Sequence, residues 1–144
     1  MKINYNKEDL TEHYGIAAVI KDKESRILMQ NHVKYNFWTI PVGKVPLNKS
    51  PEEGLKQEIY EECGIKVQKL KQLAKEEMIY IRGNKKVKVI EILFEVIEYS
   101  GEVKNKEPEK HKEQKFMAIK EIEKLPYLSN QTLRYLKISG IKKP

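Results

Sequence analysis

The stretch GKVPLNKSPEEGLKQEIYEECGIKV, residues Gly43 to Val67, predicts a loop followed by a short helix with well-defined ends. Ser50 can cap the helix N-terminus, and Pro51 suits the first helical position because its missing N–H costs nothing there. Gly64 is typical of the residue just beyond a helix C-terminus. We therefore expect a helix over Pro51–Glu62.

The five glutamates of this helix fall into two groups. Glu52 and Glu53 lie in the first turn, where Glu53 can complete a capping box. Glu58, Glu61 and Glu62 are spaced i, i+3 and i+4 and project from one side of the helix end. Like charges at this spacing cost roughly 0.2–0.5 kcal/mol, and each anion near a helix C-terminus costs roughly 0.3–1 kcal/mol. A hard divalent cation, Mg²⁺ or Mn²⁺, would relieve this repulsion. The alternative is an exposed face rich in a strong helix former.

Composition indicates one ordinary soluble domain over residues 1–144. The net charge of +7 favours anionic partners, but it also fits a solvated surface rich in lysine. Cys63 is the only cysteine, so no intrachain disulfide can form and a reducing, cytoplasmic location is expected. The longest apolar run, Tyr14–Ile20, is too short to span a membrane, so no membrane association is expected. The three histidines, which show no metal-ligand spacing, are expected on the surface or in loops: His13, His32 and His111.

β-branched and aromatic residues predict five strands: Tyr14–Lys21, Arg26–Gln30, Phe37–Ile40, Lys66–Ile81 and Lys85–Tyr99. Turn signals at Lys21–Ser25 and Arg82–Lys86 predict two hairpins. A second helix is expected over Asn130–Ile138 and a short helical turn at Lys120–Lys124. Ser100–Lys115 is polar and aperiodic, so we expect a long surface loop before a strand that begins with KFMAI. This mixture of elements predicts an α/β or α+β sandwich.

The spacing from Gly43 to Glu58-Ile-Tyr-Glu-Glu-Cys-Gly-Ile65 resembles the Nudix box, G-x5-E-x7-R-E-U-x-E-E-x-G-U, where U is aliphatic. FWTIPVGK upstream resembles the family's W-x-x-P-G-G-K segment, and residues 105–126 resemble its later loop, strand and Leu-Pro turn. Three positions depart from the pattern: Lys49 stands for the first glutamate, Gln57 for the arginine and Val42 for the first glycine. The resemblance implies an α/β/α sandwich with a central mixed sheet.

The family likeness also implies an activity, a Nudix-type hydrolysis of a pyrophosphate bond in a nucleoside diphosphate linked to another group. It implies Mg²⁺, with Mn²⁺ as a substitute, held by Glu58, Glu61, Glu62 and Gly43. Glu58 and Glu61 are candidate catalytic residues, together with a carboxylate from the later loop. Glu107, Glu109 and Glu113 are all candidates for that carboxylate, and Glu109 and Glu113 are preferred because they lie nearest the following strand.

Substrate contacts are expected from Lys44, Lys49 and Trp38. Lys49 either contacts substrate phosphate or points into solvent. Phe37 and Tyr80 are further candidates for stacking on a base, although aromatic residues in strands more often belong to the core.

Three other functions remain open. Lys49 and Gln57 are compatible with a Nudix-like sensor or binding domain that has lost hydrolysis, and the basic surface is compatible with an RNA 5′-end pyrophosphohydrolase or a general RNA-binding module. The preferred partner is a small nucleotide or dinucleotide. A homodimer is expected only because members of the family that the chain resembles are often dimers.

Overall fold

The computed structural model describes residues 12–140, apart from the side chain of Arg82. Its ten elements follow one another in this order: β1 (Glu12–Val19), β2 (Ile27–His32), β3 (Phe37–Thr39), β4 (Val42–Pro46), α1 (Pro51–Cys63), β5 (Lys66–Arg82), β6 (Lys85–Ser100), β7 (His111–Met117), α2 (Ile119–Glu123) and α3 (Asn130–Ile138). No helix in this part of the chain is both long enough and apolar enough to cross a membrane.

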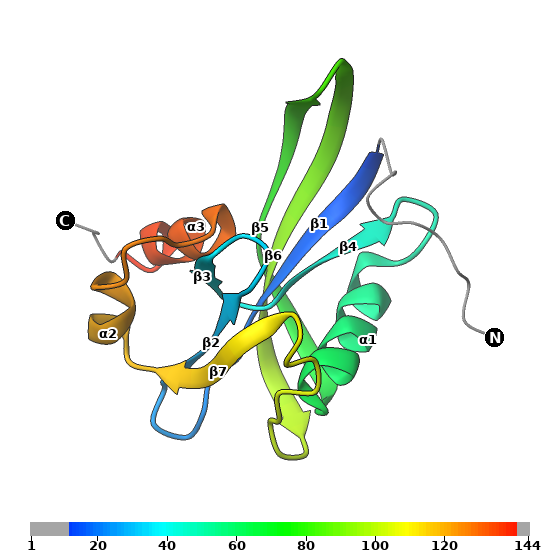
Figure 1. Ribbon diagram of the computed structural model, residues 1–144. Coiled ribbons are helices and arrows are strands. Elements are labelled where there is room, and N and C mark those ends of the chain that lie inside the picture. The colour runs from blue at the N-terminus through cyan, green and yellow to red at the C-terminus, as the bar shows by residue number, and fades with distance from the viewer. Residues whose placement is uncertain (1–11, 141–144) are drawn as a thin grey trace.

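The strands form two sheets (Figure 1). The larger has the order β4-β1-β6-β5; β1 and β6 run parallel, and the other neighbours are antiparallel. The smaller sheet, β3-β2-β7, is antiparallel. Figure 1 shows α1 on one side of the large sheet and α2 and α3 on the other. The predicted sandwich with a central mixed sheet is therefore confirmed.

Alternation along β1 explains how both faces of the large sheet become buried. Ile16 and Ala18 belong to an apolar cluster that includes Leu55 and Ile59 of α1. Ala17 and Val19 belong to a second cluster that includes side chains of α2 and α3. Since successive side chains of a strand point to opposite faces, one short strand anchors helices on both sides.

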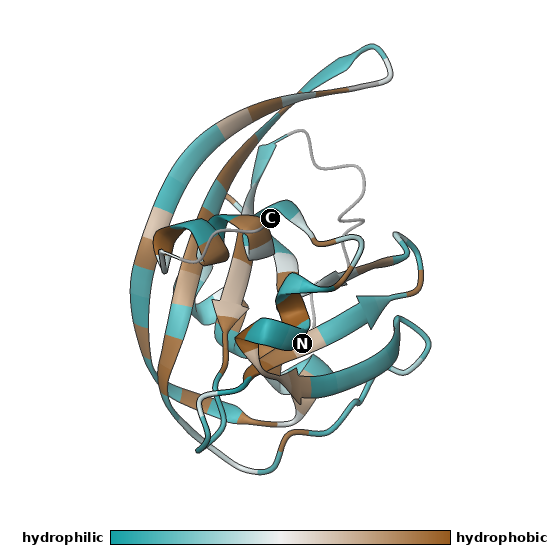
Figure 2. Ribbon diagram, turned by 90° about the vertical axis from the view of Figure 1, so that its left-hand side faces the viewer, coloured by the Kyte–Doolittle hydropathy of each residue, from teal (hydrophilic) through white to brown (hydrophobic). Residues whose placement is uncertain are grey.

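The ribbon formed by β5 and β6 extends beyond the rest of the fold (Figure 1). Figure 2 shows hydrophobic and hydrophilic residues alternating along it. Ile79 and Ile81 lie on its exposed side, while Val87 and Val89 are buried. The ribbon thus has one face turned inward, toward the cleft described below.

Two helix predictions are confirmed. The Ser50 Oγ accepts a hydrogen bond from the Glu53 N–H at 3.2 Å and starts α1, which ends one residue later than expected, at Cys63. Gly64 has φ +75°, which an L side chain rarely adopts, and its N–H donates to the Tyr60 carbonyl. The helix α3 has the predicted bounds.

Three strand predictions need correction. The turn at Lys21–Ser25 is not a hairpin, because β1 and β2 belong to different sheets and are linked only by an isolated bridge from Lys21 to Ile27. The predicted hairpin at Arg82–Lys86 is confirmed by the pairing of β5 with β6. Residues Val42–Pro46 are an edge strand, because an edge position tolerates the proline that suggested a loop. The strand β7 begins at His111 rather than Lys115, since pairing with β2 overrides its polar sequence.

Close packing of α1 on β4 predicts the effect of Gly54→Ala. An added Cβ would lie 2.5 Å from Cγ2 of Val45 and 2.8 Å from its Cγ1. Overpacking of this kind costs about 1–3 kcal/mol, and the gain in helix propensity offsets about 1 kcal/mol at most. We expect a lower free energy of unfolding in urea. The Val45→Ala change should relieve the clash, so the double variant should be more stable than additivity predicts; strict additivity would contradict this explanation.

Candidate active site

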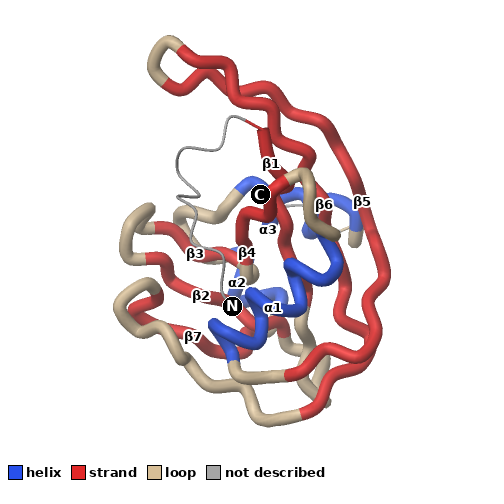
Figure 3. Tube along the Cα trace, turned by 90° about the vertical axis from the view of Figure 1, so that its right-hand side faces the viewer, coloured by secondary structure: helices blue, strands red, loops and turns tan. Residues whose placement is uncertain are grey.

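The loop between β6 and β7 is docked on the C-terminal end of α1. The Lys104 N–H donates to the Cys63 carbonyl at 2.9 Å, and the Lys106 N–H donates to the Glu62 carbonyl at 3.0 Å. These bonds satisfy helix carbonyls that otherwise lack a partner. They also fix the loop beside the acidic end of the helix, as Figure 3 shows for the chain path.

A cleft of about 690 Å³ opens beside this end of α1. Side chains from β1, the β2–β3 turn, β4, α1, the β5–β6 ribbon, the β6–β7 loop and α3 line it: His13, Gly15, Ile16, His32, Val33, Lys34, Tyr35, Val42, Gly43, Lys44, Glu58, Glu62, Tyr80, Val89, Glu91, Glu109, Lys110, Asn130 and Gln131. The cleft therefore brings together five predicted metal, catalytic or substrate residues and one stacking candidate, Tyr80; the five are Gly43, Lys44, Glu58, Glu62 and Glu109.

Two carboxylates and one glycine form the part of this cleft best suited to a cation. Glu62 is only 5% exposed, and Glu58 packs against the backbone of β4. A Cβ at residue 43 would lie 3.2 Å from Cδ of Glu58, so glycine is needed for this close approach. Within residues 12–140, no group of three or more His, Cys, Asp or Glu side chains forms a ready metal centre. The hard oxygen donors of Glu58 and Glu62 nevertheless fit Mg²⁺ or Mn²⁺.

Glu61 lies beside the cleft without lining it. Its Oε1 accepts a hydrogen bond from Nε2 of Gln57 at 3.1 Å. Gln57 stands where the Nudix pattern has arginine, and it still orients this carboxylate, through a neutral amide instead of an ion pair.

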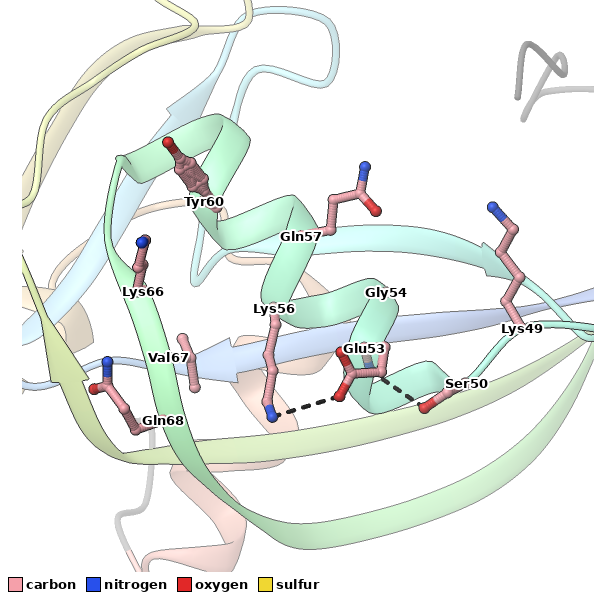
Figure 4. Close-up of a pocket in the computed structure, with 10 residues that line it drawn as sticks. All are labelled: Lys49, Ser50, Glu53, Gly54, Lys56, Gln57, Tyr60, Lys66, Val67 and Gln68. Carbon is pink, nitrogen blue, oxygen red and sulfur yellow. Dashed lines mark hydrogen bonds and ion pairs between the residues drawn. The ribbon is translucent and has the colours of Figure 1, made fainter. Parts of the chain in front are cut away.

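Lys49 and Gln57 line a different groove, of about 660 Å³, beside α1 and the start of β5 (Figure 4). Figure 4 shows Lys49 on the loop before α1 and Gln57 on α1 itself. Lys56 in the same groove is paired with Glu53 at 3.5 Å. Lys49 thus lines a surface other than the cleft that holds Glu58 and Glu62.

Glu113 and Trp38 also lie apart from the cleft lining. Glu113 is exposed on β7 and forms an ion pair with Lys115 at 3.6 Å. The Lys115 Nζ lies 5.7 Å from the centre of the Trp38 ring, which packs against the apolar cluster shared with α2 and α3. Of the two preferred loop carboxylates, Glu109 alone lines the cleft.

The histidines differ from expectation, because His13 and His111 are buried on strands. Burial, together with the charges of nearby His32 and Lys110, lowers the pKa of His111 to about 4. Burial and the charges of Lys110 and Lys34 also lower the pKa of His32, which lines the cleft. The two rings meet edge to face with their centres 5.5 Å apart. No local pattern indicates this contact, since only β2–β7 pairing brings the two residues together.

A buried polar group at the far end of the cleft was also missed. Glu91 is 7% exposed and accepts hydrogen bonds from the Tyr80 hydroxyl at 2.5 Å and from Nη1 of Arg134 at 2.7 Å. The available signal was a glutamate inside the apolar run of β6, VKVIEILFEV. A charge in such a run needs a partner, and a partner lay far away in sequence, on α3.

Comparison with known proteins places the chain in a family. A family model described as NUDIX domain matches residues 11–137, which is most of the chain. The chain belongs to the NUDIX domain family. The predicted Nudix membership is therefore confirmed. The stretch that resembles the Nudix box, residues 43–65, lies in β4, α1 and the loop between them, and ends just before β5.

Similar proteins extend this NUDIX assignment. A MutT-like protein of Streptomyces ambofaciens is 32% identical over 54 residues, covering 38% of this chain; the chain spans about a third, 35%, of that relative's length. The crystal structure of a MutT NUDIX hydrolase from Burkholderia pseudomallei has a TM-score of 0.71 and 25% identity, covering 88% of this chain and 96% of the other. The NUDIX domain of Shewanella oneidensis NrtR, crystallised with ADP ribose, shares the fold: its TM-score is 0.69 at 11% identity, covering 95% and 92% of the two chains.

Proposed function

We propose that this NUDIX protein is a Mg²⁺-dependent pyrophosphohydrolase acting on a nucleoside diphosphate linked to another group. The observation that carries the proposal is the shared cleft: carboxylates of Glu58, Glu62 and Glu109 line it together with Gly43 and Lys44. Membership of the NUDIX family and the likeness to a MutT NUDIX hydrolase support the reaction type.

The roles of the residues follow from their chemistry. Bound Mg²⁺, or Mn²⁺, supplies positive charge to the diphosphate and lowers the pKa of an attacking water. Glu58 and Glu62 would hold the cation, and Glu61, directly before Glu62 in the last turn of α1, would support it. Lys44 offers a positive charge to the diphosphate, and Glu109 accepts the proton of the water. Catalysis by this site consists mainly of positioning and charge stabilisation.

A nucleotide-type substrate is supported by the breadth of the cleft, which Tyr80 lines with an aromatic side chain. The NrtR domain bound to ADP ribose shows that this fold accepts such a ligand in another protein. We place the reaction in the cytoplasm because Cys63 is the only cysteine and no intrachain disulfide can form, which suits a reducing compartment. The single domain over residues 1–144 and the homodimer stay predictions.

The experiment is a screen for Mg²⁺-dependent release of phosphate or nucleoside monophosphate. The panel should contain nucleoside triphosphates, dinucleoside polyphosphates, ADP-ribose and RNA with a 5′-triphosphate. Turnover of a small nucleotide that stops in EDTA would support the proposal, and preferential turnover of RNA would move the activity to RNA 5′ ends. Tight binding without turnover under Mg²⁺ or Mn²⁺ would replace it with the sensor function. The positions of Lys49 and Gln57 outside the cleft favour hydrolysis over the sensor, because the cleft carboxylates stay intact.

A further inference from the structure

The far end of the cleft contains a tyrosine whose position is fixed by a buried ion pair. The Tyr80 hydroxyl donates to Oε1 of Glu91, while Nη1 of Arg134 donates to Oε2. Arg134 is held in turn by Oε1 of Gln131 at 3.0 Å and Oε2 of Glu76 at 2.9 Å. Both carboxylate oxygens of Glu91 are thus engaged by donors from different elements, β5 and α3.

Strand register determines how the Tyr80 ring lies. On β6, Val87 is directly opposite Tyr80 and Glu91 is opposite Glu76, so the hydroxyl reaches a residue four positions farther along β6. Tyr80, Val87 and Glu91 share one face of the ribbon. Directly paired residues of two strands point to the same face, and so do residues two apart along one strand. The Tyr80 side chain therefore runs along the ribbon to reach Glu91, and Tyr80 lines the cleft.

The neighbouring strand β1 packs closely against this part of β6. Gly15 of β1 is paired with Glu91, and a Cβ there would lie 2.9 Å from Cγ1 of Val89 and 3.6 Å from Cγ of Glu91. Asn130 and Gln131 also line this end of the cleft, where the Gln131 amide donates to the Gly15 carbonyl and accepts from Arg134. An aromatic side chain and a side-chain amide that line one end of a cleft are features that can hold a nucleobase.

We propose that the Tyr80 ring is the stacking wall for the nucleobase of the substrate, and that Glu91, held by Arg134, is the positioning residue that sets the ring. This inference rests on the proposed function, because it places the diphosphate at Glu58 and Glu62 and the nucleoside at the other end of the same cleft. The Tyr80 hydroxyl stays a donor to Glu91 at neutral pH, since burial and the adjacent carboxylate raise its pKa to about 12.

Tyr35 provides the matched control. It is a second tyrosine of the cleft lining, 49% exposed, and it lies at the other rim with its ring centre 4.7 Å from that of His32 and 5.3 Å from that of Phe37. Among the described residues, the hydrogen bonds of Glu91 come from Tyr80 and Arg134 and do not involve Tyr35. Stacking on Tyr35 is the competing arrangement that the experiment must distinguish.

Nucleotide binding, measured in the absence of catalysis, tests the stacking role of Tyr80 directly. AMP, GMP, CMP and UMP are titrated into the protein in EDTA by NMR, beside ribose 5-phosphate, which has no base. We expect Tyr80→Leu to weaken the binding of nucleoside monophosphates about tenfold or more and to leave ribose 5-phosphate unchanged. Tyr35→Leu should leave both unchanged. Equal binding by Tyr80→Leu and wild type, or a loss confined to Tyr35→Leu, would overturn the proposal, as would failure of wild type to prefer any nucleotide over ribose 5-phosphate.

The positioning role has a separate readout. Glu91→Gln keeps an acceptor for the Tyr80 hydroxyl and should bind nucleoside monophosphates nearly as wild type does, whereas Glu91→Leu should lose the preference for them. If the leucine variants fail to fold, intermolecular NOEs in the wild-type protein provide the test. Protons of the base should show NOEs to the Tyr80 ring. NOEs to Tyr35 alone would overturn the proposal that the base stacks on Tyr80. Because these measurements need no metal and no turnover, they can succeed even where hydrolysis is absent.

Discussion

Replacing Glu62 with glutamine is expected to lower kcat for pyrophosphate hydrolysis by about 10²- to 10³-fold. The substitution keeps the size of a side chain that is 5% exposed and removes its negative charge. A metal ion contributes several kcal/mol to the stabilisation of the transition state, and each 1.36 kcal/mol corresponds to about tenfold in rate. Glu58→Gln should have an effect of the same order, because Glu58 lines the same cleft beside Gly43.

The measurement is kcat at saturating substrate over a range of Mg²⁺ concentrations, together with thermal unfolding to show that the fold persists. Glu52→Gln, in the first turn of α1, and Glu113→Gln, on β7, are the matched controls because both glutamates lie outside the cleft lining. Both controls should keep wild-type activity. A Glu62→Gln enzyme that turns over as fast as these controls would remove Glu62 from the metal site.

For Glu61, the sequence spacing and the position in the structure predict different roles. By spacing alone it is equivalent to Glu58 and Glu62, yet it lies outside the cleft lining and accepts a hydrogen bond from Gln57. A supporting role predicts a smaller loss of kcat for Glu61→Gln than for Glu62→Gln. Equal losses would instead place all three carboxylates on the cation.

Local signals predicted α1 and its chemistry well, because its cap, its proline and its terminal glycine act within a few residues of one another. The same reasoning missed β4 and the start of β7, where pairing with a distant strand outweighs a polar or proline-containing sequence. It also missed the link between Glu91 and Arg134, which are 43 residues apart. Local pattern thus located the acidic end of the cleft, and tertiary contacts alone assembled the other end.

Acid should destabilise the fold through His111, because this side chain is 2% exposed and its Nδ1 has no hydrogen-bond partner among the described residues. Burial lowers its pKa from 6.5 to about 4, with His32 and Lys110 adding to the shift and Glu109 opposing it. The unfolded chain takes up a proton near pH 6.5, while the folded protein does so only near pH 4. The free energy of unfolding should therefore fall as the pH is lowered from 6.5 to 4, by up to about 3 kcal/mol from this residue.

Urea unfolding in EDTA at a series of pH values between 7 and 4 measures this effect. His111→Leu removes the titrating group, so its free energy of unfolding should fall less steeply than that of wild type over this range. Lys112→Gln, an exposed change at the next residue of β7, should keep the wild-type slope. Other groups contribute to both curves, notably Asp22, whose pKa is lowered by hydrogen bonds and charge from Arg26 against an opposing effect of desolvation. The difference between the two slopes isolates His111, and identical slopes for wild type and His111→Leu would show that the buried imidazole is not the source of acid sensitivity.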